Sequence, residues 1–291
     1  MSTVSSTKNL PTLSRVMVQE AVRATLLEDM GLAGDVTTDA TIPVAKTAEV
    51  FMNCREEGIM AGMPIAEAAF KTVDPEVNFK PLVQDGDAVK PGQDIAGMSG
   101  PARSILSAER VALNYLCHLS GIATYTHEFA SRISHTKAVV CCTRKTIPGM
   151  RAFEKYAVKC GGGSNHRYGL DDAILIKDNH VAVAGGVAAA VQSARNFAGH
   201  LVKIEIEVDT LEQLREALKA GPDVVMLDNM SLDELRQAVA IVDGAVPLEA
   251  SGNVNVDTVK DIAETGVDMI STSKITMSAP TLDIGMDIRI R

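Results

Sequence analysis

The stretch VKIEIEVDTLEQLREALKAGPDVVMLDN (202–229) gives the clearest indication of the fold in the carboxyl-terminal half of the chain. It contains two short apolar runs, 202–208 and 223–228, on either side of an amphipathic segment, 211–220. Apolar and charged residues alternate in the first run, as in a strand, whereas the leucines between the runs have helical spacing. A strand, a helix and a second strand in this order predict a parallel βα unit.

Four further β-rich runs surround this stretch, and most are separated by helical segments. They are KAVVCCT (137–143), AILIK (173–177), PLEAS (247–251) and DMISTS (268–273). Six strands that alternate with helices predict a module of parallel βα units. The module is either an open, doubly wound sheet or a barrel, and short right-handed connections favour the barrel.

The amino-terminal part of the chain has a less regular pattern. In chain order it predicts a helix over 13–27, a turn-rich connection over 34–43, a strand over 48–54, a short helix over 64–73, strands and turns over 78–99, and a long helix from 102 that ends at Gly121. Such a mixture is typical of a second domain that lies outside the βα module.

The last segment, TLDIGMDIRIR (281–291), departs from the βα pattern. Its apolar residues, Leu282, Ile284, Met286, Ile288 and Ile290, alternate with polar residues or glycine. This alternation predicts a half-buried strand, and no helix follows it. We therefore expect the segment to pair with the amino-terminal sheet. The predicted domains are 1–114 plus 279–291, and 115–278.

Composition excludes several classes of protein. The 291 residues are 46% hydrophobic and 22% charged, which is enough for a sizeable core. A net charge of -9 and 3% aromatic residues argue against a nucleic-acid partner. No apolar run is long enough for a membrane span, and the first dozen residues are unlike a signal peptide. Five cysteines without a C-x-x-C pair favour a reducing cytoplasm.

Polar or charged residues follow every predicted strand of the carboxyl-terminal module. Because ligands of parallel α/β modules bind at the carboxyl ends of the strands, these positions predict a binding site. They are Thr143, Arg144 and Lys145 after the first strand, Lys177 after the second, Glu207 after the third, Asp228 after the fourth, Ser251, Gly252 and Asn253 after the fifth, and Ser271, Thr272 and Ser273 at the sixth.

The charge of residues 137–177 indicates an anionic ligand. This segment has eight Lys or Arg against three Asp or Glu, a net charge of +5 within an acidic chain. Arginine binds carboxylate or phosphate in a bidentate way, and lysine acts as a point charge. Three of these cations, Arg151, Lys155 and Lys159, have helical spacing and are expected on a solvated helix face instead.

Glu207 and Asp228 end neighbouring strands and are the candidate metal ligands. Mg²⁺ is usually held by carboxylates together with substrate oxygens and water. Lys203 and Glu205 share the face of Glu207 but lie deeper in the strand, so we expect them in an ion-paired polar barrel interior.

The glycines of Gly161–Ser164 match no phosphate-loop motif and could serve only as a linker or a helix stop. Asn165, His166 and Arg167 follow directly, and mobile glycines beside a His-Arg pair can close over a ligand. We expect Arg144, Arg167 and Lys177 to face one cavity with Glu207 and Asp228.

Taken together, these residues resemble the quinolinate phosphoribosyltransferase family. The similarity extends from residue 28 to residue 289. Its most specific stretches are ERVALNYLCHLSGIAT (109–124), CTRKTIPGMRAFEKYAVKCGGGSNHRYGLDDAILIKDNH (142–180), EIEVDTLEQL (205–214), VVMLDN (224–229) and EASGNVN (249–255).

The resemblance implies an α/β protein with an amino-terminal open-faced α/β sandwich and an incomplete α/β (TIM-like) barrel. It implies homodimers, or higher assemblies, in which each active site is completed by the partner subunit. It also implies an enzyme that uses Mg²⁺ and converts quinolinate and phosphoribosyl pyrophosphate to nicotinate mononucleotide, pyrophosphate and CO₂ in NAD biosynthesis.

The resemblance also implies a role for each matched position. Quinolinate would contact Arg144, His166, Arg167 and Lys177, with Thr143 alongside. Lys145 would lie near both substrates, and Arg110 would reach the site of the partner subunit. Glu207 and Asp228 would contact the ribose hydroxyls and Mg²⁺, and with Lys145 they are the predicted catalytic residues. Ser251, Gly252 and Asn253 would bind the 5-phosphate, with Ser271, Thr272 and Ser273 near it.

One loop departs from the family pattern. Several members have V-G-A-L-T where this chain has TSKIT (272–276), so Ser273 replaces a glycine. Hydroxyl groups and Lys274 could compensate for the lost backbone contact. Two other interpretations of the whole sequence are a related pyrophosphorylase with another acceptor, such as the molybdenum-operon homologues, and a non-catalytic barrel that binds anions or nucleotides.

Overall fold

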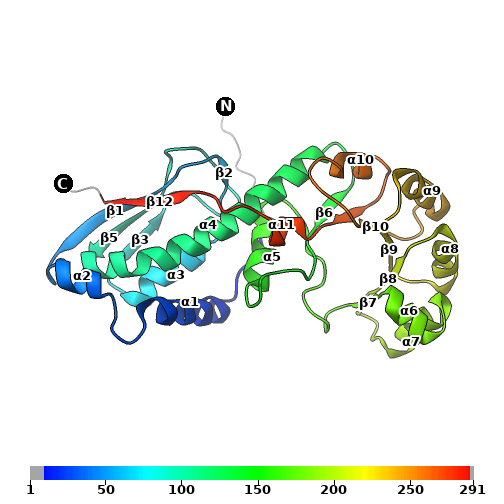
Figure 1. Ribbon diagram of the computed structural model, residues 1–291, viewed down its shortest axis with the longest axis horizontal. Coiled ribbons are helices and arrows are strands. Elements are labelled where there is room, and N and C mark those ends of the chain that lie inside the picture. The colour runs from blue at the N-terminus through cyan, green and yellow to red at the C-terminus, as the bar shows by residue number, and fades with distance from the viewer. Residues whose placement is uncertain (1–9, 289–291) are drawn as a thin grey trace. The chain divides into compact units, whose positions relative to one another are not determined.

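The computed structural model describes residues 10–288, which form two compact units (Figure 1). The first unit contains the described residues up to 125, then 152–162, and the chain from 279 onward. The second contains 126–151 and 163–278. The expected boundary at 114 falls inside a continuous helix, α4 (Ala102–Arg132), and the units divide further along that helix.

The first unit is built on a four-stranded antiparallel sheet in the order β12-β1-β5-β3 (Figure 1). Its strands are β1 (Thr47–Cys54), β3 (Asn78–Pro81), β5 (Asp94–Pro101) and β12 (Ile284–Ile288), and a two-stranded ribbon is formed by β2 (Gly58–Ile59) and β4 (Ala88–Val89). Its helices are α1 (Arg15–Met30), α2 (Val36–Thr41), α3 (Met63–Val73), most of α4, and α5 (Arg151–Cys160).

The prediction that the last segment joins the amino-terminal sheet is confirmed. β12 pairs antiparallel with β1, with Met286 opposite Met52 and Ile284 opposite Cys54. The side chains of Leu282 and Ile284 are buried, as the alternation requires. Ile290, which belongs to the same pattern, lies outside the described residues.

The prediction that 34–43 is only a turn-rich connection is wrong, because α2 forms there. Asp35 caps this helix by accepting the backbone N–H of Thr38 at 2.9 Å. Its second carboxylate oxygen accepts the hydroxyl of Ser107 at 3.0 Å, which fixes α2 against α4. These hydrogen bonds lower the pKa of Asp35. A short helix with one buried residue has too little apolar periodicity to be recognised from sequence.

The prediction that the long helix ends at Gly121 is also wrong, since α4 continues to Arg132. A Cβ atom at Gly121 would overlap the carbonyl oxygen of Pro280 and approach the backbone of Thr281. Gly121 therefore allows the chain that leads to β12 to cross close to α4. This glycine serves a tertiary contact and does not terminate the helix.

Helix α5 is buried in the first unit. Glu154, which is fully buried, bonds to His118 of α4 with a distance of 3.0 Å between Oε1 and Nε2. Tyr156 donates its hydroxyl to Asp85 at 2.7 Å, and burial raises the pKa of both groups. Lys155 is fully buried too, so the expectation that it lies on a solvated helix face is wrong.

The second unit contains the six predicted parallel strands in the order β6-β11-β10-β9-β8-β7. They are β6 (Val139–Cys141), β7 (Ile174–Ile176), β8 (Ile204–Val208), β9 (Val224–Asp228), β10 (Leu248–Ser251) and β11 (Met269–Ser271). The helices that follow them are α6 (Asp178–Ala184), α7 (Val187–Phe197), α8 (Leu211–Ala220), α9 (Leu232–Val242), α10 (Val259–Ala263) and α11 (Lys274–Met277).

This strand order distinguishes the barrel from the doubly wound sheet. Five strands follow one another in chain order and β6 lies beside the last, as in a barrel that is open between β6 and β7. On the open side Ser164 bonds to β6, donating its N–H to Val140 and accepting the N–H of Cys142. The expected incomplete barrel is confirmed.

No helix among residues 10–288 is long and apolar enough to span a membrane. None of the five cysteines forms a disulfide.

Candidate active site

A cavity of about 450 Å³ lies at the carboxyl ends of the parallel strands in the second unit. We call it the strand-end cavity. It is lined by Thr143, Lys145, Lys177, Glu207, Asp228, Asn229, Ser251, Gly252, Asn253, Val254, Ser271, Thr272, Ser273 and Lys274. Most of the residues that follow the predicted strands therefore do meet in one place.

The strand order divides the strand-end cavity into two parts. Lys177, Glu207 and Asp228 follow the adjacent strands β7, β8 and β9. Hydroxyls, amides and two further lysines follow β10, β11 and β6. One part is thus dominated by a carboxylate pair and the other by hydrogen-bond donors and positive charge.

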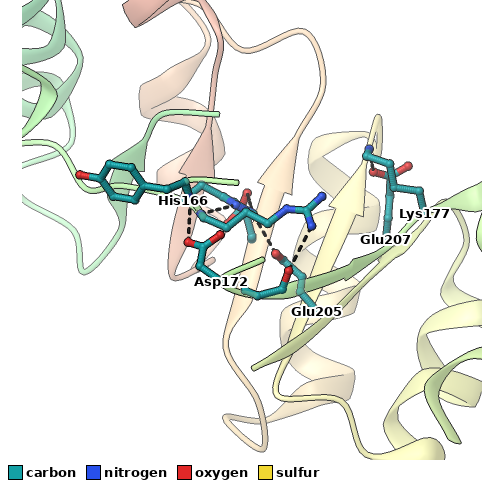
Figure 2. Close-up of polar contacts among 9 residues, drawn as sticks. His166, Asp172, Lys177, Glu205 and Glu207 are labelled. Carbon is teal, nitrogen blue, oxygen red and sulfur yellow. Dashed lines mark hydrogen bonds and ion pairs between the residues drawn. The ribbon is translucent and has the colours of Figure 1, made fainter. Parts of the chain in front are cut away.

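Lys177 and Glu207 form the closest ion pair of this site, with 2.5 Å between Nζ and Oε2 (Figure 2). The carboxylate is 9% exposed, whereas the lysine is 48% exposed and accessible to a ligand. Lys177 is held at the start of α6, where His180 Nδ1 accepts its backbone N–H at 2.9 Å. A bound carboxylate could therefore compete with Glu207 for this ammonium group.

The loops after β9 and β10 are interlocked. Asn229 N–H bonds to the carbonyl of Ser251 at 2.9 Å, and Asn253 Nδ2 donates to Asn229 Oδ1 at 3.3 Å. A Cβ atom at Gly252 would overlap Asn229, and Gly252 has a φ of +96° that disfavours other residues. Asp228 accepts Asn229 Nδ2 at 2.7 Å, so its carboxylate is held beside the same loop.

A second cluster lies inside the barrel. His166 Nε2 is 2.8 Å from Glu205 Oε2 (Figure 2). It is 3.8 Å from Glu249 Oε1. The cluster borders a cavity of about 390 Å³, the interior cavity, whose lining includes Cys141, Ile174, Glu205, Val224, Glu249 and Met269, one from each strand or its start. A single cavity lined from all six strands indicates that the sheet curves around it.

In the interior cluster, which consists of His166, Glu205 and Glu249, the hydrogen bonds determine where the protons lie. His166 Nδ1 accepts the backbone N–H of Arg167 at 2.7 Å, so the ring proton lies on Nε2 and is donated to Glu205. Burial raises the pKa of Glu249, and the neighbouring Glu205 raises it further. The ligand atoms of the three residues lie within 4.8 Å of one another, but the imidazole has no lone pair left for a cation.

Neither Arg144 nor Arg167 lines the strand-end cavity in this structure, so the expectation that they share it with Lys177 stays a prediction. Arg167 lines the interior cavity, as does His166, and donates from Nη1 to the carbonyl of Ala173 at 3.1 Å. The Nε atoms of both arginines are buried without a hydrogen-bond partner. Burial lowers the pKa of Arg167, and nearby Arg144 lowers it further. These unsatisfied donors identify Arg144 and Arg167 as neighbouring groups with capacity for another acceptor.

Arg110 lies on an exposed position of α4 in the first unit. Its expected role toward a partner subunit stays a prediction.

The sequence analysis left out two residues that line the strand-end cavity, Asn229 and Val254, and named Lys274 only as a compensating group. Asn229 and Val254 are the next residues after the predicted positions Asp228 and Asn253, so extending each of these strand ends by one residue would have included them. It also left out Glu249, a charged residue within the buried strand β10, whose signal is a carboxylate between apolar neighbours.

Glu207 and Asp228 suit a magnesium ion in their chemistry, since both are carboxylates at one cavity. Among residues 10–288 these two do not join a third His, Cys, Asp or Glu in a group close enough to hold an ion. An ion at this position would therefore take its other ligands from substrate and water.

Comparison with known proteins agrees with this architecture over nearly the whole chain. The models of the quinolinate phosphoribosyl transferase N-terminal and C-terminal domains match residues 35–120 and 122–287. A probable nicotinate-nucleotide pyrophosphorylase [carboxylating] of Bacillus subtilis is 41% identical over 278 residues, which is 96% of each chain.

Solved structures give the same result. The nicotinate-nucleotide pyrophosphorylase of Francisella tularensis is 38% identical with a TM-score of 0.91, covering 96% of this chain and 99% of that one. The Ehrlichia chaffeensis structure is 39% identical with a TM-score of 0.90, covering 96% and 100%. With both domain models matched and these identities, the chain belongs to the quinolinate phosphoribosyl transferase family.

Proposed function

We propose that this protein transfers the phosphoribosyl group of phosphoribosyl pyrophosphate to quinolinate, giving nicotinate mononucleotide, pyrophosphate and CO₂ in NAD biosynthesis. The observation that carries the proposal is the strand-end cavity, where a carboxylate pair adjoins lysines and hydroxyl groups. A space of about 450 Å³ is within the range of pockets that bind small ligands. The family of the chain supports the choice of reaction.

The first step of this reaction needs electrostatic stabilisation. Pyrophosphate leaves with the electron pair of its bond to the anomeric carbon, and positive charge develops on the ribose ring, as in glycoside cleavage. Glu207 and Asp228 would stabilise this charge, since preorganised groups of opposite sign act strongly in a site that excludes water. Lys145 would neutralise the departing anion.

The second step follows from the first. The lone pair of the pyridine nitrogen forms the new bond to the anomeric carbon, and the ring becomes cationic. The bond to the 2-carboxylate then breaks, its electron pair stays on the ring carbon, CO₂ departs and a proton from water replaces it. The protein contributes mainly by positioning, because no strong base is required.

Quinolinate would be bound by cations. Lys177 would contact one of its carboxylates, in competition with Glu207. Thr143, Arg144, His166 and Arg167 would bind the remainder. This requires Arg144 and Arg167 to present their guanidinium groups to the strand-end cavity. Their buried Nε atoms have no hydrogen-bond partner, so donating a hydrogen bond to a ligand there would be favourable.

Magnesium would be held by Glu207 and Asp228 together with substrate oxygens. When bound, it would neutralise charge on the pyrophosphate group. The hydroxyls and amides of Ser251, Gly252, Asn253, Ser271, Thr272 and Ser273 would bind phosphate from the opposite part of the cavity.

We further propose a homodimer, or a higher assembly, in which Arg110 completes the site of the partner subunit. Mixing an Arg110→Ala variant with a Lys145→Ala variant should restore partial activity, because some hybrid sites would contain both residues. A lack of recovery, with subunit exchange confirmed, would contradict a shared site. We place the enzyme in the cytoplasm, in keeping with five cysteines that form no disulfide.

The acceptor specificity tests the proposed function. Purified protein with Mg²⁺ and phosphoribosyl pyrophosphate is given quinolinate, nicotinate or nicotinamide, and released pyrophosphate and CO₂ are measured. The proposal predicts equal amounts of both products with quinolinate alone. Pyrophosphate with another acceptor would indicate a different pyrophosphorylase, and no turnover with any acceptor would indicate a binding protein.

A further inference from the structure

One arginine joins the two loops that carry the predicted quinolinate-binding arginines. Arg144 belongs to residues 142–150, which connect β6 to α5, and Arg167 belongs to residues 161–173, which connect α5 to β7. We call these segments the β6 loop and the α5 loop. Arg151, the first residue of α5, donates hydrogen bonds to both of them.

The three hydrogen bonds of the Arg151 guanidinium group are divided between the loops. In the β6 loop, the hydroxyl of Thr146 accepts Nε at 3.1 Å and the carbonyl of Arg144 accepts Nη2 at 3.5 Å. In the α5 loop, the carbonyl of Tyr168 accepts Nη1 at 2.9 Å. Because a guanidinium group is planar and its donors point in fixed directions, these bonds set the spacing of the two loops.

The acceptors of Arg151 leave the arginines of both loops available for a ligand. Arg151 bonds only to backbone carbonyls and to one hydroxyl, so the side chains of Arg144 and Arg167 can turn without breaking these bonds. The sequence predicts Arg151 on a solvated helix face, but it is half-buried and forms no ion pair with a carboxylate of residues 10–288. Its contacts are therefore made to the loops.

The loops need such a connection because their arginines repel each other. Burial lowers the pKa of Arg167, and nearby Arg144 lowers it further. Two guanidinium groups in a partly buried place tend to separate until an anion neutralises them. The bonds of Arg151 to the carbonyl of Arg144 and to the carbonyl of Tyr168, next to Arg167, oppose that separation in the ligand-free protein.

We propose that Arg151 is a positioning residue for quinolinate, which sets the spacing of Arg144 and Arg167 for a ligand with two carboxylates. This inference rests on the proposed function. Arg151 does not contact the substrate in this proposal. Its contribution is preorganisation, since loops that are already in place cost less to order when the ligand binds.

The other substrate should depend much less on Arg151. Lys145 has a separate anchor, because Thr276 of α11 donates its hydroxyl to the carbonyl of Lys145 at 2.7 Å. The predicted phosphate-binding residues follow β10 and β11, whereas the bonds of Arg151 end on the β6 loop and the α5 loop. Loss of Arg151 should therefore raise the KM for quinolinate and leave the KM for phosphoribosyl pyrophosphate unchanged.

This difference between the two KM values separates positioning from a general loss of stability. A variant that is only less stable contains fewer active molecules, so its apparent kcat falls while both KM values stay the same. A variant with misplaced quinolinate-binding groups has a higher KM for that substrate alone.

The test measures kcat and both KM values for the wild type, Arg151→Ala, Arg151→Lys, Thr146→Val and Arg195→Ala. Thr146→Val removes one acceptor and keeps Arg151, so it serves if Arg151→Ala does not fold. Arg195→Ala is the matched control. Arg195 also joins a helix to a loop, donating to the carbonyl of Gly221 at 2.7 Å, but this loop precedes β9 at the amino ends of the strands.

Hydrogen exchange of the ligand-free proteins gives a second readout that does not depend on turnover. Amides of 143–147 and 165–169 should exchange about fivefold to tenfold faster in Arg151→Ala, the size of one lost hydrogen bond. Arg195→Ala should leave both segments as in the wild type.

Arg151→Ala is expected to raise the KM for quinolinate about tenfold. This is less than the roughly hundredfold loss that a 1 Å misplacement can cause, because both loops keep their other contacts. Arg151→Lys should recover part of the loss, since an ammonium group can reach some of the acceptors, and Thr146→Val should show a smaller rise. Arg195→Ala should keep both wild-type KM values.

An unchanged KM for quinolinate in Arg151→Ala and Thr146→Val would overturn the inference while the proposed function stands. So would an equal rise in both KM values, a fall in kcat alone, or the same rise in Arg195→Ala. A wild type that gives no turnover with quinolinate would overturn the proposed function and this inference together, and the exchange rates would then show only whether Arg151 joins the two loops.

Discussion

The strand-end cavity and the interior cluster are connected by one strand and differ in what their charged groups contact. Glu207 and Glu205 lie two residues apart on β8, so their side chains share a face, and both are about one-tenth exposed. Glu207 contacts Lys177, which is half exposed, whereas Glu205 contacts His166, whose side chain is 12% exposed (Figure 2).

The position of a carboxylate along a barrel strand determines which groups it can contact. At the end of the strand, the carboxylate faces loops and an exposed partner that a ligand can displace. Two residues deeper on the same face, at Glu205, the side chains of the other strands surround the carboxylate, and it contributes to the packing of the barrel interior.

The largest effect is expected from Lys177→Ala. If Lys177 binds a carboxylate of quinolinate, its loss should lower kcat/KM about 10²- to 10³-fold, as for other preorganised electrostatic contacts. Since Lys177 is 48% exposed, thermal stability should change little. The measurement is CO₂ release from quinolinate, together with a melting curve.

Lys137→Ala is the matched control for that experiment. Lys137 also pairs with a carboxylate, Asp268 at 2.7 Å, but it precedes β6 and lies at the amino end of the strands. Normal activity is expected for it. Normal turnover in Lys177→Ala would show that Lys177 does not bind quinolinate.

A smaller effect is expected from Gly252→Ala. The new Cβ would overlap Asn229, and the positive φ adds strain, so the variant should lose about 1–3 kcal/mol of stability. It should also lose activity, because the loops after β9 and β10 are displaced together. Denaturant unfolding and steady-state kinetics measure the two effects.

Gly244→Ala distinguishes strain from overlap. Gly244 has a φ of +76°, but a Cβ there would meet no atom within 4 Å. This variant should show a loss of stability from strain alone and keep full activity. If Gly252→Ala were as active as Gly244→Ala, the interlocked loops would have no role in the site.

The smallest effect is expected in the interior cluster, from Glu249→Gln. Burial, and then Glu205, raise the pKa of Glu249 in the folded protein above its usual 4.5. The folded state therefore keeps this proton longer than the unfolded state does. The stability gained is fully present below the unfolded pKa and is lost as the pH rises through the raised pKa.

Glutamine stays neutral at every pH, so in the Glu249→Gln variant this position adds no pH dependence to the stability. Melting temperatures of both proteins are measured from about pH 5 to about pH 8, where the titration contributes to stability. The wild type should lose stability relative to Glu249→Gln as the pH rises, by on the order of 1 kcal/mol per unit of pKa difference. Parallel curves would show that Glu249 titrates normally.

Much of the fold could be predicted from periodicity. The six parallel strands and the terminal strand from Ile284 have alternating or short apolar runs in the sequence, and the structure forms strands at these places. The continuation of α4 through Gly121 could not be predicted from the sequence. The glycine is needed there because Pro280, which is distant in the sequence, lies close to α4 at this position. Burial of Lys155 has a similar origin, in the packing of α5 inside the first unit.

The candidate site could be predicted at the strand ends but not in the loop after α5. Lys177, Glu207 and Asp228 lie where the ends of adjacent parallel strands must bring them together. His166 and Arg167 belong to an irregular segment that bonds to β6 through Ser164, and its backbone path directs them to the interior cavity. No periodicity in the sequence encodes that path.

The decisive measurement is a crystal structure with quinolinate and a non-reactive analogue of phosphoribosyl pyrophosphate. We expect both ligands in the strand-end cavity, with one quinolinate carboxylate on Lys177, the ribose beside Glu207 and Asp228, and Arg144 and Arg167 turned toward quinolinate. Ligands bound elsewhere, with the Lys177–Glu207 pair intact, would contradict it.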